Sequence, residues 1–239
     1  MNNELTPANQ PANDPNPTPD AQPAPVAAVV LPHALPIFLV GMMGAGKTTI
    51  GKSLARILQR DFVDLDHELE ARCGVRIPVI FEIEGEAGFR KRECQVLEDC
   101  TVRPNIVLAT GGGAVINEQN RASLRARGIV VYLRASVDEL FRRTSRDRNR
   151  PLLATPDPKG TLRKLLDARE PFYSEVADLV VDTGTVPVNQ LVSQLIERLK
   201  SVQKTIDPLA KPYTAQAFQP FVRHAAGEDP AHESDACKQ

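Results

Sequence analysis

Residues 37–48 of this 239-residue chain read IFLVGMMGAGKT, a short apolar run followed by glycines, a lysine and a threonine. The apolar run predicts a buried strand, and the apolar residues at helical spacing over residues 50–58 predict a helix directly after it. Residues 41–48 fit the motif G-x-x-x-x-G-K-[ST] in the strand-to-helix context that this motif requires. A chance glycine-rich turn before a helix is the alternative, and the strand and helix on either side argue against it.

The residues of this loop point to phosphate binding. Glycines leave backbone N–H groups free to surround phosphate oxygens, and the following helix adds the positive end of its dipole. A lysine here reaches the β- and γ-phosphates, and the hydroxyl that follows it can bind Mg²⁺. The motif therefore predicts a nucleoside triphosphate site. Its candidate residues are Gly44, Ala45, Gly46, Lys47, Thr48 and Thr49.

Short apolar runs recur along the chain and alternate with helical patterns. We expect further strands at residues 62–63, 106–109, 130–133 and 179–181, and a last helix over residues 188–199. Wholly apolar strands that alternate with amphipathic helices are typical of a parallel sheet covered on both faces. The sequence therefore predicts an α/β fold with three layers.

Composition divides the chain into three parts. Nine of its 20 prolines fall within the first 36 residues, so we expect residues 1–35 to be a disordered, Pro-rich leader. We expect a folded domain over residues 36–202 and a flexible tail over residues 203–239, where four prolines interrupt any helix. Residues 146–160 are charged, contain proline and lack an apolar period, which predicts a mobile lid.

Charge and hydropathy exclude several classes of protein. The first basic residue is Lys47, which argues against a targeting segment or a basic nucleic-acid arm at this end. Residues 37–202 carry a net charge of +3, too little for a nucleic-acid-binding domain and suitable for handling anionic small molecules. No apolar stretch is long enough to span a membrane, and the four cysteines show no metal-ligand spacing. We expect a cytoplasmic protein with reduced thiols.

Three further clusters lie at predicted strand or helix ends, where ligands bind in open α/β sheets. Asp64 and Asp66 could hold magnesium and an acceptor hydroxyl, or they could cap a helix in solvent. Arg90, near the opening of a helix, could bind an anion or form a surface pair with Glu93. The glycines at 111–113 could present backbone N–H groups to a ligand or form a tight turn.

Arginines gather in the second half of the chain. Arg143 precedes the predicted lid, Arg150 lies within it, and Arg169 follows it. An arginine on a closing lid could neutralise the charge that develops during phosphoryl transfer. Taken singly, each of these residues is most often a surface arginine.

Taken together, these motifs resemble the shikimate kinase family over about residues 36–201. The matching residues are 41–48, 62–66, Gly85-Glu86 with Phe89-Arg90 and Glu93, 110–113, 150–153, and Arg169 with Pro171 and Tyr173. The resemblance implies transfer of the ATP γ-phosphoryl group to the 3-hydroxyl of shikimate, a step toward aromatic amino acids. It also implies a five-stranded parallel sheet in the order 2-3-1-4-5, a lid, and a monomer whose partners are these two small molecules.

The resemblance implies roles for the residues on the nucleotide side. Lys47 and Arg150 would contact the phosphates of ATP, and Arg143 would flank its adenine. Thr48 would bind Mg²⁺, and Asp64 would reach the metal through water.

It likewise implies roles on the acceptor side. Asp66 would hold the shikimate hydroxyls and orient or deprotonate the attacking one, so that Lys47, Asp66 and Arg150 would be the catalytic residues. Arg90 and Arg169 would bind the shikimate carboxylate. Gly112 or Gly113 would donate backbone N–H groups to the substrate.

Two other interpretations stay open on the sequence. One is a related kinase with the same phosphate loop that acts on gluconate or a nucleotide, which would also need carboxylate-binding arginines. The other is a nucleotide-binding regulatory protein without catalysis, against which the presence of Lys47, Asp66 and Arg150 argues.

Overall fold

The structure is a computed structural model that describes residue 31 and residues 34–145, 151–153, 155–184 and 186–204. Its elements in chain order are β1 (Ile37–Val40), α1 (Lys47–Leu58), β2 (Asp61–Asp64), α2 (Leu65–Cys73), α3 (Ile77–Thr101), β3 (Ile106–Ala109), the 3₁₀ helix η1 (Ala114–Ile116), α4 (Glu118–Arg127), β4 (Ile129–Arg134), α5 (Val137–Thr144), the 3₁₀ helix η2 (Pro151–Leu153), α6 (Pro158–Val176), β5 (Leu179–Asp182) and α7 (Val188–Lys200).

The five strands form one parallel sheet in the order β2-β3-β1-β4-β5, as the sequence predicts. Every residue of β1 and β3 is buried, and in β4 only the last residue is exposed. Strands that are buried on both faces need no polar alternation, which explains their continuous apolar sequences. The two edge strands, β2 and β5, are more exposed and carry aspartates at their ends.

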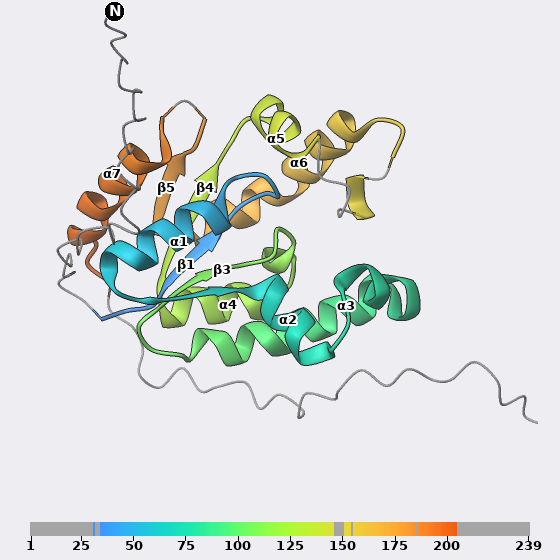
Figure 1. The fold of residues 1–239 in the computed structure, drawn as a ribbon, viewed down its shortest axis with the longest axis horizontal. Coiled ribbons are helices and arrows are strands. Elements are labelled where there is room, and N and C mark those ends of the chain that lie inside the picture. The colour runs from blue at the N-terminus through green and yellow to red at the C-terminus, as the bar shows by residue number, and fades with distance from the viewer. Residues whose placement is uncertain (1–30, 32–33, 146–150, 154, 185, 205–239) are drawn as a thin grey trace, which may run out of the picture.

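Helices cover both faces of the sheet and complete the three predicted layers. α1 packs on β2 and β3 and against α7, so these two helices form one outer layer. The other layer consists of α3, α4 and α6 (Figure 1). In this layer α4 packs on β4 and contacts both α3 and α6. None of the helices in the described ranges is long and apolar enough to cross a membrane.

The carboxyl ends of β1, β2 and β3 lie level with one another. Ala109, at the end of β3, is in register with Leu39 on one side and with Asp64 on the other. The loop after β1, the aspartates after β2 and the glycines after β3 therefore emerge at the same edge of the sheet. This juxtaposition is the feature of the fold that builds the site.

Helix α3 differs from the sequence prediction, which places Arg90 near the opening of a helix. The helix begins at Ile77 and is kinked at Gly85, whose φ of 67° and ψ of −174° are not helical. Arg90 therefore lies one turn beyond the kink. The kink redirects the second half of α3, which carries Arg90 and Glu93.

The domain boundaries also differ in detail from those predicted. Leu31 is buried in the core and Leu35 packs against it, so these two residues of the predicted leader are part of the fold. At the other end, Lys204 forms an ion pair of 2.6 Å with Asp178. α6 begins at Pro158, so the last residues of the predicted lid 146–160 are helical, while residues 146–150 lie outside the described residues.

Candidate active site

The loop between β1 and α1 turns tightly and needs glycine at two positions. Gly44 and Gly46 have φ angles of 82° and 95°, a region that residues with side chains rarely adopt. A Cβ at Gly44 would also lie 2.7 Å from Thr144 Cγ2. Lys47 Nζ donates hydrogen bonds of 2.8 and 3.0 Å to the carbonyl oxygens of Gly41 and Met42. The lysine thus lies along the loop, with its charge at the carboxyl end of β1.

A cavity of about 390 Å³, here called the smaller cavity, opens beside this loop. Its lining contains all the predicted triphosphate-site residues of the loop except Ala45, which is buried. The lining residues are Met43, Gly44, Gly46, Lys47, Thr48, Thr49, Asp64, Asp66, Thr110, Gly112 and Arg143.

Asp64 caps a helix, as one of the two alternatives predicts, and it also accepts a hydrogen bond from Thr48 beside the loop. Its Oδ2 accepts a hydrogen bond of 2.8 Å from the Thr48 hydroxyl, and its Oδ1 accepts one of 3.2 Å from the backbone N–H of Asp66. The second bond caps α2, because Asp64 is the N-cap residue of that helix. The first bond places two oxygen atoms together on the wall of the smaller cavity.

This oxygen pair fits a magnesium ion. Among the described residues, no group of three or more His, Cys, Asp or Glu side chains could hold a metal. Mg²⁺, however, is usually bound by one or two protein oxygens together with water and substrate phosphates. Thr48 and Asp64 supply oxygens of that kind beside the phosphate loop.

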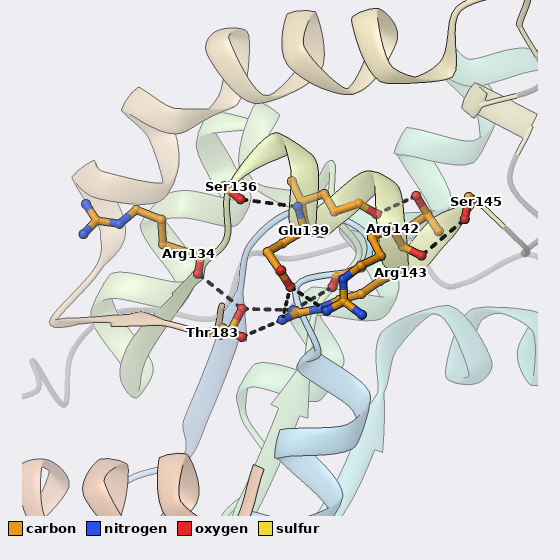
Figure 2. A network of polar contacts seen from close by, with 10 residues as sticks. Arg134, Ser136, Glu139, Arg142, Arg143, Ser145 and Thr183 are labelled. Carbon is orange, nitrogen blue, oxygen red and sulfur yellow. Dashed lines mark hydrogen bonds and ion pairs between the residues drawn. The ribbon is translucent and has the colours of Figure 1, made fainter. Parts of the chain in front are cut away.

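Arg143 lines the smaller cavity. Its side chain makes polar contacts with three segments of the chain (Figure 2). Its guanidinium donates to the carbonyl oxygens of Gly44 at 3.3 Å and Thr183 at 2.6 Å, and it pairs with Glu139 at 2.9 Å. The phosphate loop, α5 and the turn after β5 therefore meet at one side chain.

A second cavity of about 560 Å³, here called the larger cavity, lies between α2, α3 and α6. It contains the predicted acceptor residues together with an apolar wall. The lining residues are Met43, Asp66, His67, Glu70, Arg76, Ile77, Pro78, Phe81, Phe89, Arg90, Glu93, Gly111, Gly112, Gly113, Leu152 and Arg169.

Arg90 forms the pair with Glu93 that the sequence allowed, but not on a solvent face. Its Nη1 lies 2.7 Å from Glu93 Oε2, and its Nη2 lies 3.0 Å from Glu86 Oε1. The Glu93 side chain is only 1% exposed, and its Oε1 has no hydrogen-bond partner within the described part of the chain. Burial raises the pKa of Glu93 to about 6, against the opposing effect of Arg90. The pair thus holds the guanidinium at the cavity wall.

The glycines after β3 let charged groups approach the backbone closely. A Cβ at Gly111 would clash with Glu93 Oε1 and lie 3.1 Å from Asp66 Oδ1. A Cβ at Gly113 would clash with the guanidinium of Arg90. The segment is also a turn, because the N–H of Ala114 donates to the Gly111 carbonyl at 3.2 Å. The interpretation of the triple glycine as a turn is therefore confirmed, and its contact with a ligand stays a prediction.

Arg169 and Arg90 reach the larger cavity from different helices. Arg169, on α6, is 4% exposed and donates through Nη1 to the Gly112 carbonyl oxygen at 3.2 Å. Two guanidinium groups in one cavity can grip a carboxylate by charge-assisted hydrogen bonds. Their charges are partly offset by Glu93 and by Asp66, which also line the cavity.

The two cavities meet at three shared residues, Met43, Asp66 and Gly112. Asp66 therefore borders the cavity with the two guanidinium groups on one side and the loop of residues 41–48 on the other. A carboxylate in this position can accept a proton from a hydroxyl that approaches a phosphate. The arrangement suits phosphoryl transfer between two small anions.

The site contains residues to which the sequence assigns no role, and one predicted residue lies outside the described residues. Met43 was an unassigned position of the loop motif, and Thr110 had no predicted role. Glu93 belongs to the family motif, but the sequence assigns it no role beyond a surface pair with Arg90. Its spacing of three residues from Arg90 is the signal that relates it to the site. Arg150 falls within residues 146–150, outside the described residues.

Comparison with known proteins matches the part of the chain that contains both cavities. The family model described as shikimate kinase matches residues 43–200. The shikimate kinase of Bordetella pertussis is 64% identical over 202 residues, 84% of this chain and 94% of that protein. The shikimate kinase of Bordetella avium is 70% identical over 176 residues, 74% of this chain and 84% of that protein.

The solved structures that match this chain are also shikimate kinases. The structure of shikimate kinase from Acinetobacter baumannii in complex with shikimate matches with a TM-score of 0.69 and 49% identity, covering 70% of this chain and 94% of that one. Shikimate kinase from Bacteroides thetaiotaomicron matches with a TM-score of 0.66 and 34% identity, covering 70% and 99%.

Proposed function

Since this chain belongs to the shikimate kinase family, we propose that it transfers the γ-phosphoryl group of ATP to the 3-hydroxyl of shikimate, giving 3-phosphoshikimate and ADP. The observation that carries the proposal is the junction of the two cavities at Asp66 and Gly112. An acceptor held in the larger cavity would present a hydroxyl to a phosphate held at the loop.

Arg90 and Arg169 bind the shikimate carboxylate in this proposal. Both guanidinium groups line the larger cavity, and each is oriented by a partner, Glu93 for Arg90 and the Gly112 carbonyl for Arg169. Guanidinium groups with fixed orientation lose little freedom when they bind a carboxylate. Backbone N–H groups of Gly112 or Gly113 complete the contacts with the substrate.

Asp66 orients the attacking hydroxyl and accepts its proton. As the bond between the hydroxyl oxygen and the γ-phosphorus forms, the bond from that phosphorus to the β–γ bridging oxygen breaks, and ADP leaves. The hydroxyl proton passes to the carboxylate of Asp66. In such reactions catalysis comes mainly from positioning and from stabilising charge on the transferred group.

Lys47 and the loop N–H groups hold the phosphates of ATP, with Arg150 of the lid as a further contact. Lys47 and Arg150 are the positive charges that would stabilise the transferring phosphoryl group. Arg143 flanks the adenine, at the point where the phosphate loop and the turn after β5 meet. The role of Arg150 rests on its match to the family motif over residues 150–153.

Thr48 and Asp64 would hold the magnesium ion, Asp64 through water. When bound with ATP, the ion neutralises phosphate charge. The chain's own contribution is to keep the Thr48 and Asp64 oxygens 2.8 Å apart on the cavity wall.

A coupled assay of ADP release tests the proposal. We expect magnesium-dependent ADP production with shikimate and none above background with gluconate or a nucleoside monophosphate. Turnover of gluconate without turnover of shikimate would contradict the substrate, and ATP binding without turnover of any acceptor would favour a regulatory role.

A further inference from the structure

Tyr173 lies behind the larger cavity rather than on its wall. It follows Arg169 by one turn of α6, and its side chain is 0% exposed. Its hydroxyl donates a hydrogen bond of 2.5 Å to the carbonyl oxygen of Gly112, 61 residues earlier in the chain. The proposed reaction assigns no task to this contact.

The bond acts on a peptide unit that borders both cavities. The Gly112 carbonyl accepts from Tyr173 and, at 3.2 Å, from Arg169, so both donors come from α6. In a planar trans peptide the carbonyl of one residue and the N–H of the next point in opposite directions. The N–H of Gly113 is therefore directed away from α6. Gly113 itself lines the larger cavity beside the Arg90 guanidinium.

This peptide unit depends on such external bonds. Residues 111–113 carry no side chains, and a peptide between two glycines is the least restricted that a chain can contain. The turn bond from the Ala114 N–H to the Gly111 carbonyl spans this peptide unit without touching it, and such a turn allows its central peptide either of two orientations. The hydrogen bonds from α6 are made to the Gly112 carbonyl itself, so they favour one of these orientations.

Tyr173 is itself held firmly in one position. Its ring stacks on Tyr132, with centroids 5.0 Å apart and an interplanar angle of 19°. The Tyr132 hydroxyl in turn donates to the carboxylate of Glu170. Burial raises the pKa of both phenols well above the usual range, so both hydroxyls remain protonated donors near neutral pH.

We propose that Tyr173 is a positioning residue: by holding the Gly112 carbonyl, it directs the Gly113 N–H toward shikimate in the larger cavity. The inference rests on the proposed function and goes beyond it, because it assigns substrate positioning to a side chain that does not touch the substrate. Losing the Tyr173 hydroxyl should weaken shikimate binding while leaving the ATP site intact.

The substitution Tyr173→Phe removes one oxygen and keeps the ring stack. We expect the KM for shikimate to rise about fivefold to tenfold, the scale of one lost hydrogen bond, with the KM for ATP within about twofold. Tyr132→Phe is the matched control, because it removes a buried hydroxyl from the adjacent ring without touching Gly112. It should lower the Tm without a selective change in the KM for shikimate.

Equal changes in both KM values, or the same shikimate effect in the two variants, would overturn the inference and leave a structural role. If Tyr173→Phe folds poorly, its folded fraction is purified and its Tm is measured with and without each ligand. The rise in Tm that shikimate gives is then compared with the rise that ATP gives. Selective loss of the shikimate effect supports the inference, and loss or retention of both overturns it. Failure of the wild-type enzyme to phosphorylate shikimate would instead contradict the proposed function.

Discussion

The Thr48 hydroxyl donates a hydrogen bond of 2.8 Å to Asp64 Oδ2, joining the start of α1 to the end of β2 across 16 residues. The same aspartate caps α2 through its other oxygen. One side chain therefore links the phosphate loop, the proposed magnesium position and the helix that carries Asp66.

The substitution Asp64→Asn separates the charge of this residue from its capping role. The amide oxygen still caps α2, but the negative charge is lost, so we expect the Mg²⁺ concentration for half-maximal activity to rise about tenfold. Asp64→Ala should show the same magnesium effect and lose a further ~1 kcal/mol of stability with the cap. Magnesium titrations and denaturant unfolding measure the two effects, and an unchanged magnesium requirement in Asp64→Asn would rule out the metal role.

Arg90→Ala should weaken shikimate binding by about 1.5–3 kcal/mol, the scale of a lost charge-assisted hydrogen bond, and leave ATP binding largely intact. The neighbouring Arg92 is the matched control, because it pairs with Glu84 at 2.6 Å and does not line either cavity. Calorimetric titration with each ligand measures the difference. Equal losses for ATP and shikimate would show that Arg90 is a structural residue.

Gly85→Ala should destabilise the protein by about 1–3 kcal/mol, because the φ of 67° and ψ of −174° at this kink are accessible essentially to glycine alone. Gly74 also has a positive φ, 69°, but with a ψ of 9° in the left-handed helical region. Gly74→Ala should therefore cost only about 1–2 kcal/mol. Neither position has another group within 4 Å of a built Cβ, so the comparison isolates backbone strain.

The two glycine variants should also differ in activity. Because the kink at Gly85 sets the direction of the helix segment that carries Arg90, we expect only Gly85→Ala to raise the KM for shikimate. Steady-state kinetics measures the KM for shikimate, and urea unfolding measures the stability of each variant. Identical behaviour of the two variants would refute a special role for the kink.

The buried carboxyl of Glu93 predicts a pH-dependent stability. Its pKa is raised from 4.5 to about 6 on folding, so between these values the folded state binds more protons than the unfolded state. The stability contribution of this group is therefore complete below pH 4.5 and is lost as the pH rises through 6. Relative to Glu93→Gln, the wild type should lose roughly 2 kcal/mol of unfolding free energy across this window.

Denaturant unfolding of the wild type and of Glu93→Gln at closely spaced pH values tests this prediction. The titrations of all other groups cancel in the difference between the two unfolding free energies. A difference between them that is independent of pH from 4 to 7, about the span of both pKa values, would show that Glu93 keeps an ordinary pKa.

Removing residues 1–30 should leave turnover and Tm nearly unchanged, as the composition of this segment predicts. Removing residues 1–35 should cost about 1.5–3 kcal/mol, because it also deletes Leu31, which is 7% exposed in the core. It deletes the Leu35 carbonyl as well, which accepts a hydrogen bond from Arg60. Thermal unfolding of the two truncated proteins compares them directly, and equal Tm values would mean that the Leu31 contact contributes nothing.

Much of the fold could be predicted because its signals are local. The strands at 37–40 and 106–109 coincide with the predicted ranges, since a buried parallel strand is a continuous apolar run. The last helix, Val188–Lys200, matches its apolar period closely. The start of α3 could not be predicted in the same way, because Gly85 interrupts the period that would have joined its two halves.

The site could be predicted less completely, because its residues work in combination. The alternatives for Asp64, for Arg90 with Glu93 and for the triple glycine could not be separated from spacing. In each case the structure shows the structural alternative, and the ligand contact stays a prediction: Asp64 caps α2 and accepts from Thr48, and Glu93 pairs with Arg90 while it is buried. A local sequence pattern shows which residues can contact one another, but it does not show whether they are buried or exposed.

By itself, the sequence determined the strand, phosphate loop and helix over residues 37–58 and the alternation of strands and helices, since these depend on neighbours a few residues apart. Only the tertiary structure decided that Asp66 and Gly112 lie between two cavities, and that Tyr173 reaches the Gly112 carbonyl. The physical reason is that these residues lie 46 and 61 positions apart in the chain. Parallel strands bring Asp66 and Gly112 to one edge of the sheet, and the packing of α6 on η1 brings Tyr173 to the Gly112 carbonyl.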